Sequence, residues 1–144
     1  MKKLLQLATL ALLFTIQSTA FAESSGSVGN YIVHYNALST ESLPPAVARA
    51  YGITRSKNRG LLNISVLRKG GDFQGVEATI DVSATNLTGQ LRNINLRKIE
   101  DQNAIYYISE FSVTDRETLD FSIQVTTADN QKGNFKLRQQ FFTN

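Results

Sequence analysis

The sequence contains no cysteine among its 144 residues. Disulfides, thiol catalysis and thiolate metal sites are therefore excluded, and so is a lipid anchor attached through a cysteine. A small exported domain without disulfides depends on the burial of apolar side chains and on strand pairing for its stability. Absence of cysteine also fits a bacterial periplasm better than a eukaryotic secretory route.

Histidine is almost as scarce, because His34 is the one histidine in the chain. This argues against catalytic triads and metal sites that need several imidazoles. The chain has no Gly-x-Ser-x-Gly elbow and no EF-hand loop, and its carboxylates are spread singly. An enzyme is therefore disfavoured, and no cofactor and no metal are predicted. We interpret His34 as a structural residue on a strand face, with ligand contact as the alternative.

Apolar runs long enough to cross a membrane are also missing. The longest, from Leu4 to Ile16, follows Lys2 and Lys3 and precedes Ala20-Phe21-Ala22. A short apolar run between a basic start and an Ala-x-Ala site predicts a secretory signal peptide, since a membrane span needs about 20 residues. We expect cleavage after Ala22, a flexible lead-in over 23–29, one domain over 30–144, and a periplasmic protein without stable membrane insertion.

Without the predicted signal peptide, neither positively nor negatively charged side chains are in strong excess. Without Lys2 and Lys3 the chain has 13 cations against 12 carboxylates, a net charge of +1 in place of +3. That balance gives no support to a nucleic-acid partner. Any cationic binding surface must be local.

Alternation of apolar and polar residues dominates the rest of the chain. In 75–85, for example, Val76, Ala78, Ile80 and Val82 alternate with polar residues, and a period of two predicts a strand. Seven such strands are expected, at 28–37, 60–68, 75–85, 90–99, 104–113, 119–125 and 135–141. Their spacing predicts an all-β, immunoglobulin-like antiparallel sandwich, with a small antiparallel barrel as the alternative.

The stretch from Leu43 to Gly60 interrupts this pattern. Pro45 suits the first turn of a helix and Gly52 the residue past its end, so we expect one short helix with Val47, Ala50 and Tyr51 on one stripe.

Cations alternate after this helix, at Arg55, Lys57 and Arg59. In an extended segment they would form a row able to hold a carboxylate, a phosphate or an acidic peptide. A solvated edge that discourages strand pairing is the simpler interpretation. The candidate ligand-binding residues are His34, Tyr51, Arg55, Lys57 and Arg59.

The sequence resembles the DUF4426 family of small gammaproteobacterial proteins. The resemblance lies in YIVHYN at 31–36, LPPAVARAYGITRSKNR at 43–59 and NISV at 63–66. It implies a periplasmic, single-domain, sandwich-like protein and assigns no reaction and no site residue.

Three functions are compatible with these observations. The first is a non-enzymatic periplasmic binding or accessory module that holds an unknown protein, peptide or anionic ligand on the 43–60 segment. The second is a small periplasmic hydrolase or lyase that uses His34 with a hydroxyl or carboxylate. The third is a structural envelope protein that self-associates, since the sequence leaves the oligomeric state open.

Overall fold

The computed structural model describes residues 24–72 and 74–144, so the expected signal peptide lies outside the described residues. The elements in these ranges are β1 (Ser24–Val28), β2 (Tyr31–Ser39), a 3-10 helix η1 (Thr40–Ser42), α1 (Pro45–Ala50), β3 (Arg59–Arg68), β4 (Ala78–Asn86), β5 (Leu91–Ile94), β6 (Arg97–Asp101), β7 (Ala104–Ser112), β8 (Glu117–Thr127) and β9 (Lys132–Phe141).

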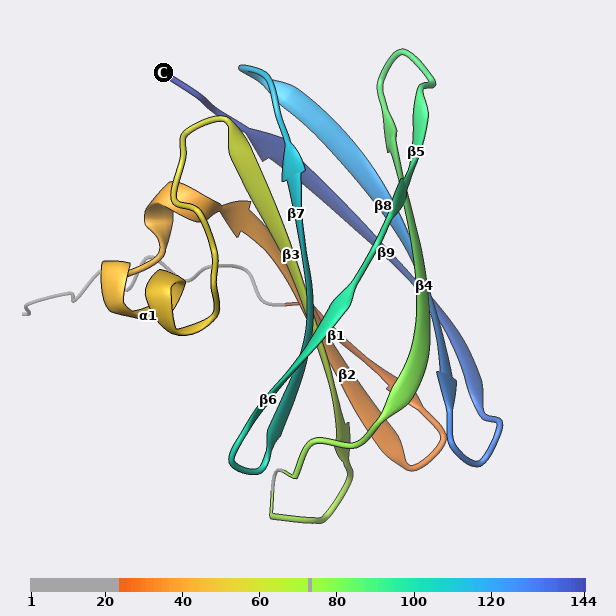
Figure 1. The fold of residues 1–144 in the computed structure, drawn as a ribbon. Coiled ribbons are helices and arrows are strands. Elements are labelled where there is room, and N and C mark those ends of the chain that lie inside the picture. The colour runs from red at the N-terminus through yellow and green to blue at the C-terminus, as the bar shows by residue number, and fades with distance from the viewer. Residues whose placement is uncertain (1–23, 73) are drawn as a thin grey trace, which may run out of the picture.

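The strands form two antiparallel sheets that face each other, one in the order β1-β2-β3-β7-β6 and the other β5-β4-β8-β9 (Figure 1). The orders β2-β3-β7-β6 and β4-β8-β9 match the A-B-E-D and C-F-G sheets of an immunoglobulin domain, and β5 takes the place of the additional strand C′. The predicted immunoglobulin-like sandwich is thus confirmed. The two sheets do not close into the alternative barrel in the described part of the chain.

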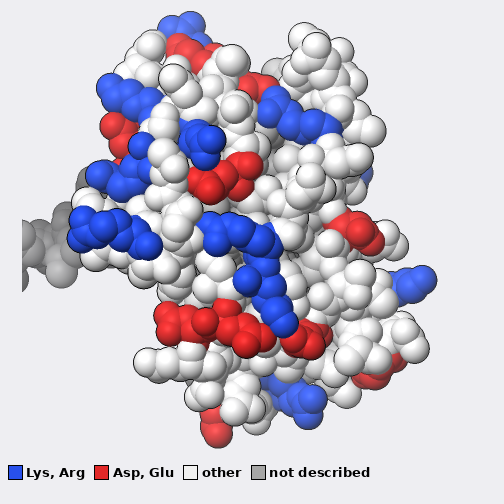
Figure 2. Space-filling view, in the orientation of Figure 1, with Lys and Arg blue, Asp and Glu red and all other residues white. Residues whose placement is uncertain are grey.

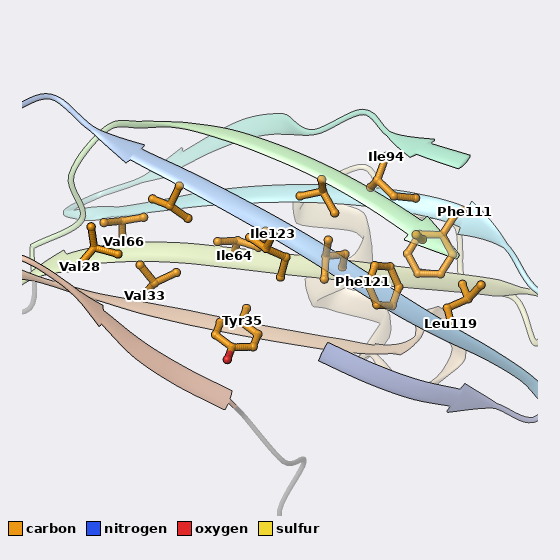
Figure 3. Close-up of a cluster of buried hydrophobic side chains, with 14 of the residues drawn as sticks. Val28, Val33, Tyr35, Ile64, Val66, Ile94, Phe111, Leu119, Phe121 and Ile123 are labelled. Carbon is orange, nitrogen blue, oxygen red and sulfur yellow. The ribbon is translucent and has the colours of Figure 1, made fainter. Parts of the chain in front are cut away.

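Alternate residues of the strands point between the sheets and form the main core. Val33 in β2, Ile64 in β3 and Ile123 in β8 are fully buried there. Phe111 of β7 packs with its ring 5.5 Å from that of Phe121 (Figure 3). Because side chains alternate across a strand, one apolar face per strand is enough to fill this core.

Two strands were not expected from the sequence. Ser24–Val28, predicted to belong to a flexible lead-in, is the edge strand β1 and pairs with Tyr31–Tyr35 of β2. The expected strand 90–99 is two strands, β5 and β6, which belong to different sheets. The chain crosses from one sheet to the other at Asn95 and Leu96, between β5 and β6.

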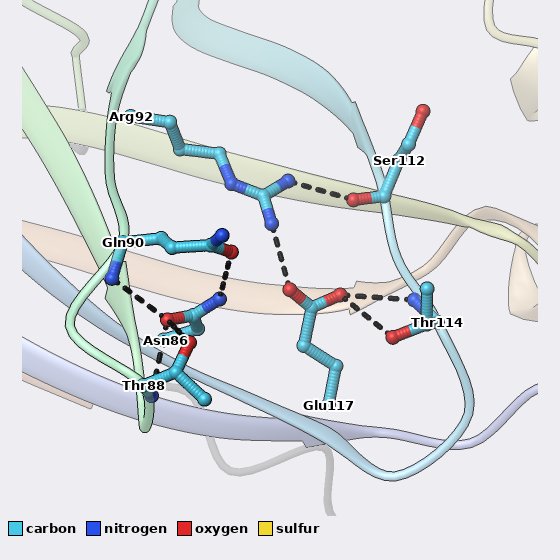
Figure 4. Close-up of polar contacts among 7 residues, drawn as sticks. All are labelled: Asn86, Thr88, Gln90, Arg92, Ser112, Thr114 and Glu117. Atoms are coloured by element: carbon cyan, nitrogen blue, oxygen red, sulfur yellow. Dashed lines mark hydrogen bonds and ion pairs between the residues drawn. The ribbon is translucent and has the colours of Figure 1, made fainter.

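Arg92 ties β5 to the opposite sheet. Its guanidinium donates to the carbonyl of Ser112 at 2.9 Å and to Glu117 at 2.7 Å (Figure 4). The other oxygen of Glu117 accepts from the backbone N–H of Thr114 at 2.9 Å. This network fixes the distance between the sheets at one end of the sandwich.

Neither helix within 24–72 and 74–144 combines the length and the apolar character that crossing a bilayer would require.

Candidate functional site

A second, smaller apolar cluster lies on the outer face of the β1-β2-β3-β7-β6 sheet. Its buried members are Ala48 and Ile53 from the segment after β2, Leu61 of β3 and Ile108 of β7. The sequence places Leu61 beside the core residue Leu62, so β3 has apolar side chains on both faces. A strand of this kind is covered on both sides. The cover here is α1, which stands against the outer side of the sheet (Figure 1).

Backbone and side-chain hydrogen bonds hold the segment 40–58 in place. Thr40 is fully buried, and its hydroxyl donates to the carbonyl of Ser56 at 3.1 Å and accepts from the N–H of Ser56 at 2.9 Å. Glu110 of β7 accepts from the N–H of Thr54 at 3.0 Å. Arg97 of β6 donates to the carbonyl of Tyr51 at 2.6 Å. The segment is therefore fastened at both ends and in the middle.

A hollow of about 150 Å³ lies between α1 and the sheet. We call it the helix-covered pocket; its lining consists of Leu38, Leu43, Val47, Tyr51, Ile53, Leu61, Asn63, Ile99, Tyr106 and Ile108. The lining is apolar apart from Asn63 and the two tyrosine hydroxyls. The two tyrosine rings lie 6.0 Å apart at 54°.

Asn63 places an amide oxygen in this apolar setting. Its Oδ1 is buried and has no hydrogen-bond partner among the described residues. A buried acceptor without a partner costs about 1–3 kcal/mol, and such groups are rare enough in native proteins to require an explanation. The oxygen is closed to solvent, so this cost is part of what the packing beneath α1 must offset.

Tyr51 is the predicted site residue that lines the pocket. Its hydroxyl donates to Asp101 Oδ2 at 3.1 Å. Burial raises the pKa of Tyr51, and the hydrogen bond to Asp101 and the charge of that carboxylate raise it further. Tyr51 is therefore held as a neutral phenol that donates outward, toward β6.

The three predicted cations lie outside the pocket lining. Residues 53–56 are irregular and 57–58 form a turn, so the extended row expected here is not formed. Arg55 donates to the carbonyl of Glu41 at 2.9 Å, and Arg59 forms an ion pair of 3.4 Å with Glu110. Lys57 is exposed in the turn. Lys and Arg side chains nevertheless gather on the α1 side of the molecule (Figure 2).

His34 lies farther along the outer face of β2 and does not line the pocket. It is half-buried, and its cross-strand neighbours are Ser25 of β1 and Ser65 of β3. The structure therefore separates His34 from Tyr51 and from the cations, instead of joining all five residues in one site.

Sequence reasoning missed Asn63, Tyr106 and the apolar residues beneath the helix. The signal was present in the strands 60–68 and 104–113. Leu61-Leu62 and Tyr106-Tyr107-Ile108 break strict alternation, which indicates strands that are apolar on both faces. A strand buried on both sides requires a covering element, and the helix was available nearby.

Fold and site together define an immunoglobulin-like sandwich whose first long connection carries a helix over a pocket. The chain belongs to the DUF4426 family: the family model, described as a domain of unknown function, matches residues 25–144. A crystal structure of a DUF4426 family protein from Pseudomonas aeruginosa PAO1 is 34% identical with a TM-score of 0.70, covering 83% of this chain and 94% of that one.

Two structures of FetP from uropathogenic Escherichia coli strain F11 are more distant. A copper-bound variant is 11% identical with a TM-score of 0.55, covering 83% of this chain and 95% of that one. FetP isolated after expression in the E. coli periplasm is 12% identical with a TM-score of 0.51, covering 82% and 91%. At these identities the likeness concerns the fold alone. A comparison with curated proteins gives no match.

Proposed function

We propose that this protein is an exported, non-enzymatic binding or accessory module of the bacterial periplasm, and that its 43–60 segment holds an anionic or peptide partner. One observation carries the proposal. The segment forms a separate layer on the sheet and contains four cations, Arg49, Arg55, Lys57 and Arg59, without a carboxylate. A connection between paired strands needs only a few residues, and this one is long, structured and basic.

The contacts of the two arginines support an anion as the partner. Each uses part of its guanidinium on an acceptor of the protein, Arg55 on Glu41 and Arg59 on Glu110. The Arg59 side chain keeps 45% of its surface exposed. A guanidinium presents five donors, so groups held in this way have others to offer to a carboxylate or phosphate.

We do not infer copper binding for this chain from the copper-bound FetP variant. Copper is held mainly by imidazole and sulfur ligands, whereas the sequence has one histidine and no cysteine. Residues 24–72 and 74–144 contain no group of three or more His, Cys, Asp or Glu suited to a metal ion. The donor set does not fit copper, and we propose no metal chemistry.

The geometry favours binding over a hydrolase or lyase. A hydrolase or lyase based on His34 would have to act on the open outer face of β2, with Ser25 and Ser65 as neighbours and away from the helix-covered pocket. Self-association is the remaining alternative. Light scattering that gives a monomer mass at high concentration would remove that alternative.

A charge-variant series tests the proposal. Replacing Arg55, Lys57 and Arg59 together by Gln removes three positive charges, so it should weaken the binding of a fluorescent oligoglutamate peptide several-fold. The measurement is made at low salt, because salt screens the attraction between exposed charges. The matched control replaces Lys132, Lys136 and Arg138 of β9. Fluorescence anisotropy gives the affinities and thermal melting checks the fold. Equal affinities for the two folded triple variants would contradict the proposal.

A further inference from the structure

We propose that two copies of this chain pair edge to edge through β6, as antiparallel strands in a register centred on Ile99. The inference goes beyond the proposed function, because β6 lies outside the 43–60 segment and the pairing uses none of the cations of that segment.

β6 has one open edge. It is the last strand of the β1-β2-β3-β7-β6 sheet, so within 24–72 and 74–144 it pairs with β7 on one side only (Figure 1). Four of its five residues are exposed, and Ile99 is half-buried. Alternate residues of an antiparallel strand direct both N–H and C=O toward the same neighbour, so the open edge presents unpaired backbone groups. A second antiparallel strand would satisfy these groups.

The charges of β6 follow an order that is complementary to itself. The strand has two cations, one apolar residue and then two carboxylates: Arg97, Lys98, Ile99, Glu100 and Asp101. When two such strands run antiparallel about Ile99, Arg97 lies opposite Asp101 of the second copy, and Lys98 lies opposite Glu100. Opposite charges directly across an antiparallel pair attract. Every charged pair in this register is therefore favourable, and the two isoleucines meet at the centre.

Symmetry leaves this register without a competitor. In a two-fold pairing, residue i of one copy opposes residue j of the other, and j opposes i. Directly opposite side chains lie on the same face of the sheet, so the register must be centred on a residue. Every other residue of β6 is charged, and a register centred on it would oppose two identical charges. Only the register centred on Ile99 avoids this repulsion.

The other sheet edges lack this property. β9 carries Lys132, Lys136 and Arg138 without a carboxylate, and cations of this kind discourage pairing at an edge. β5 has four residues and a single charge, and β1 has no charged residue. Among the edges that the structure describes, β6 is therefore the one at which charge favours a second copy.

Contacts within the chain hold the charges of β6 at this edge. Arg97 donates from Nη2 to the carbonyl of Tyr51, and Asp101 accepts from the Tyr51 hydroxyl at Oδ2. A guanidinium has five donors and a carboxylate two acceptor oxygens, so both groups retain capacity for a partner. Lys98 lies 3.0 Å from Glu100. In the pair, these two residues of both copies would form a network of alternating charge, which contributes more than an isolated exposed ion pair.

Pairing through β6 would join the two β1-β2-β3-β7-β6 sheets into one. The two-fold axis stands perpendicular to this sheet, so α1 of both copies would lie on the same outer face. An anionic partner long enough to reach both 43–60 segments would then bind with avidity. This consequence, unlike the pairing itself, rests on the proposed function.

Sedimentation equilibrium tests the pairing over a series of protein concentrations up to about 1 mM, at which even a dissociation constant of about 1 mM leaves a detectable dimer. We expect a reversible monomer–dimer equilibrium that weakens with added salt. Lys98→Glu opposes carboxylates to carboxylates, and Glu100→Lys opposes cations to cations, so each should lower the association constant roughly tenfold or more. Lys132→Glu makes the same change of charge on β9 and should leave the association constant unaltered.

Mixing the two β6 variants gives the sharpest measurement. In a mixed pair, both carboxylates of the Lys98→Glu chain face cations of the Glu100→Lys chain, so the mixture should form dimers where each variant alone does not. Thermal melting checks that both are folded. A mixture of Lys132→Glu with Glu100→Lys has the same net charges and should associate less, because it keeps one repulsive pair. The proposal is overturned if the unmodified protein is monomeric at every concentration, if Lys132→Glu weakens association as much as Lys98→Glu, or if the mixed β6 variants associate no better than the control mixture.

Discussion

Tyr51 shows how one side chain serves the helix, the pocket and the sheet edge together. It is the C-terminal cap of α1, its ring contacts Tyr106, and its hydroxyl reaches Asp101 of β6. Burial disfavours the phenolate, and the Asp101 carboxylate both accepts a hydrogen bond from the neutral phenol and repels the negative charge of a phenolate. The raised pKa of Tyr51 therefore reports that the helix is seated on the sheet.

The pH dependence of this contact follows from the direction of the shift. A raised pKa in the folded state means that Tyr51 stabilises the fold below the ordinary tyrosine value of 10.0, and that this contribution is lost as pH rises through the raised pKa. Asp101→Asn keeps an acceptor but removes the charge, so we expect the Tyr51 pKa to fall without reaching its ordinary value. A difference absorbance titration at 295 nm measures it. Asp72→Asn, at an exposed turn, is the control; matching curves for the two variants would contradict the prediction.

The connection between β2 and β3 is the element on which the proposed function rests. It contains η1 and α1, and Thr40 binds both backbone groups of Ser56 across it. The buried hydroxyl donates one of these hydrogen bonds and accepts the other, and together they join the two ends of the segment.

Thr40→Val tests that closure. Valine fills the same volume but leaves the N–H of Ser56 without a partner, whereas the Ser56 carbonyl keeps the bond from the N–H of Arg59 at 3.3 Å. We therefore expect a loss of about 1–3 kcal/mol in the free energy of unfolding. Hydrogen exchange should rise first in 40–58. Thr40→Ser keeps the hydroxyl and is the matched control. A valine variant as stable and as protected as the serine variant would show that the contact does not hold the segment.

Strands with strict alternation could be predicted from the sequence, and irregular ones could not. The inward sets of β4 and β8 follow directly from a period of two, as at Val82 and Ile123. β1 is rich in Ser and Gly, and only its pairing with β2 makes it a strand. The crossing between β5 and β6 carries no Gly or Pro, so nothing local marks the change of sheet.

The site was predictable only in part, for a related reason. Composition and the Pro45 to Gly52 spacing indicate the helix, but its buried residue is Ala48, while Val47 and Ala50 of the expected stripe are exposed. A helix of six residues gives too few repeats to define its buried face. The pocket beside Asn63 is lined by residues of β3, β7 and α1, and these distant segments meet only in the folded chain.

Without disulfides, the whole molecule depends on how closely its two sheets pack. One place where the two sheets lie close together is Gly60, at the start of β3. A Cβ there would overlap the ring of Phe111, its cross-strand neighbour in the same sheet, and lie 3.0 Å from the ring of Phe141 in the other sheet. No side chain larger than hydrogen fits unless both aromatic rings move.

Gly60→Ala should accordingly lower the free energy of unfolding by about 1–3 kcal/mol through overpacking, a large part of the 5–15 kcal/mol of a typical domain. Chemical denaturation monitored by circular dichroism measures it. Gly71→Ala is the control, because its Cβ would meet only atoms at 3.7 Å or beyond, and it should change stability little. Equal losses in the two variants would show that the aromatic packing over Gly60 does not limit stability.

The pairing of β2 with β3 has a further consequence. The ladder runs without interruption to Ser39 opposite Gly60, so the entry and exit of the intervening stretch stand side by side, as they would in a tight hairpin. The sandwich does not need that stretch to bring the two strands together. Its length and its exposed chemistry are therefore constrained only by the need to keep Leu61 and Ile108 covered, so new surface residues can be introduced there without altering the strand pairing beneath.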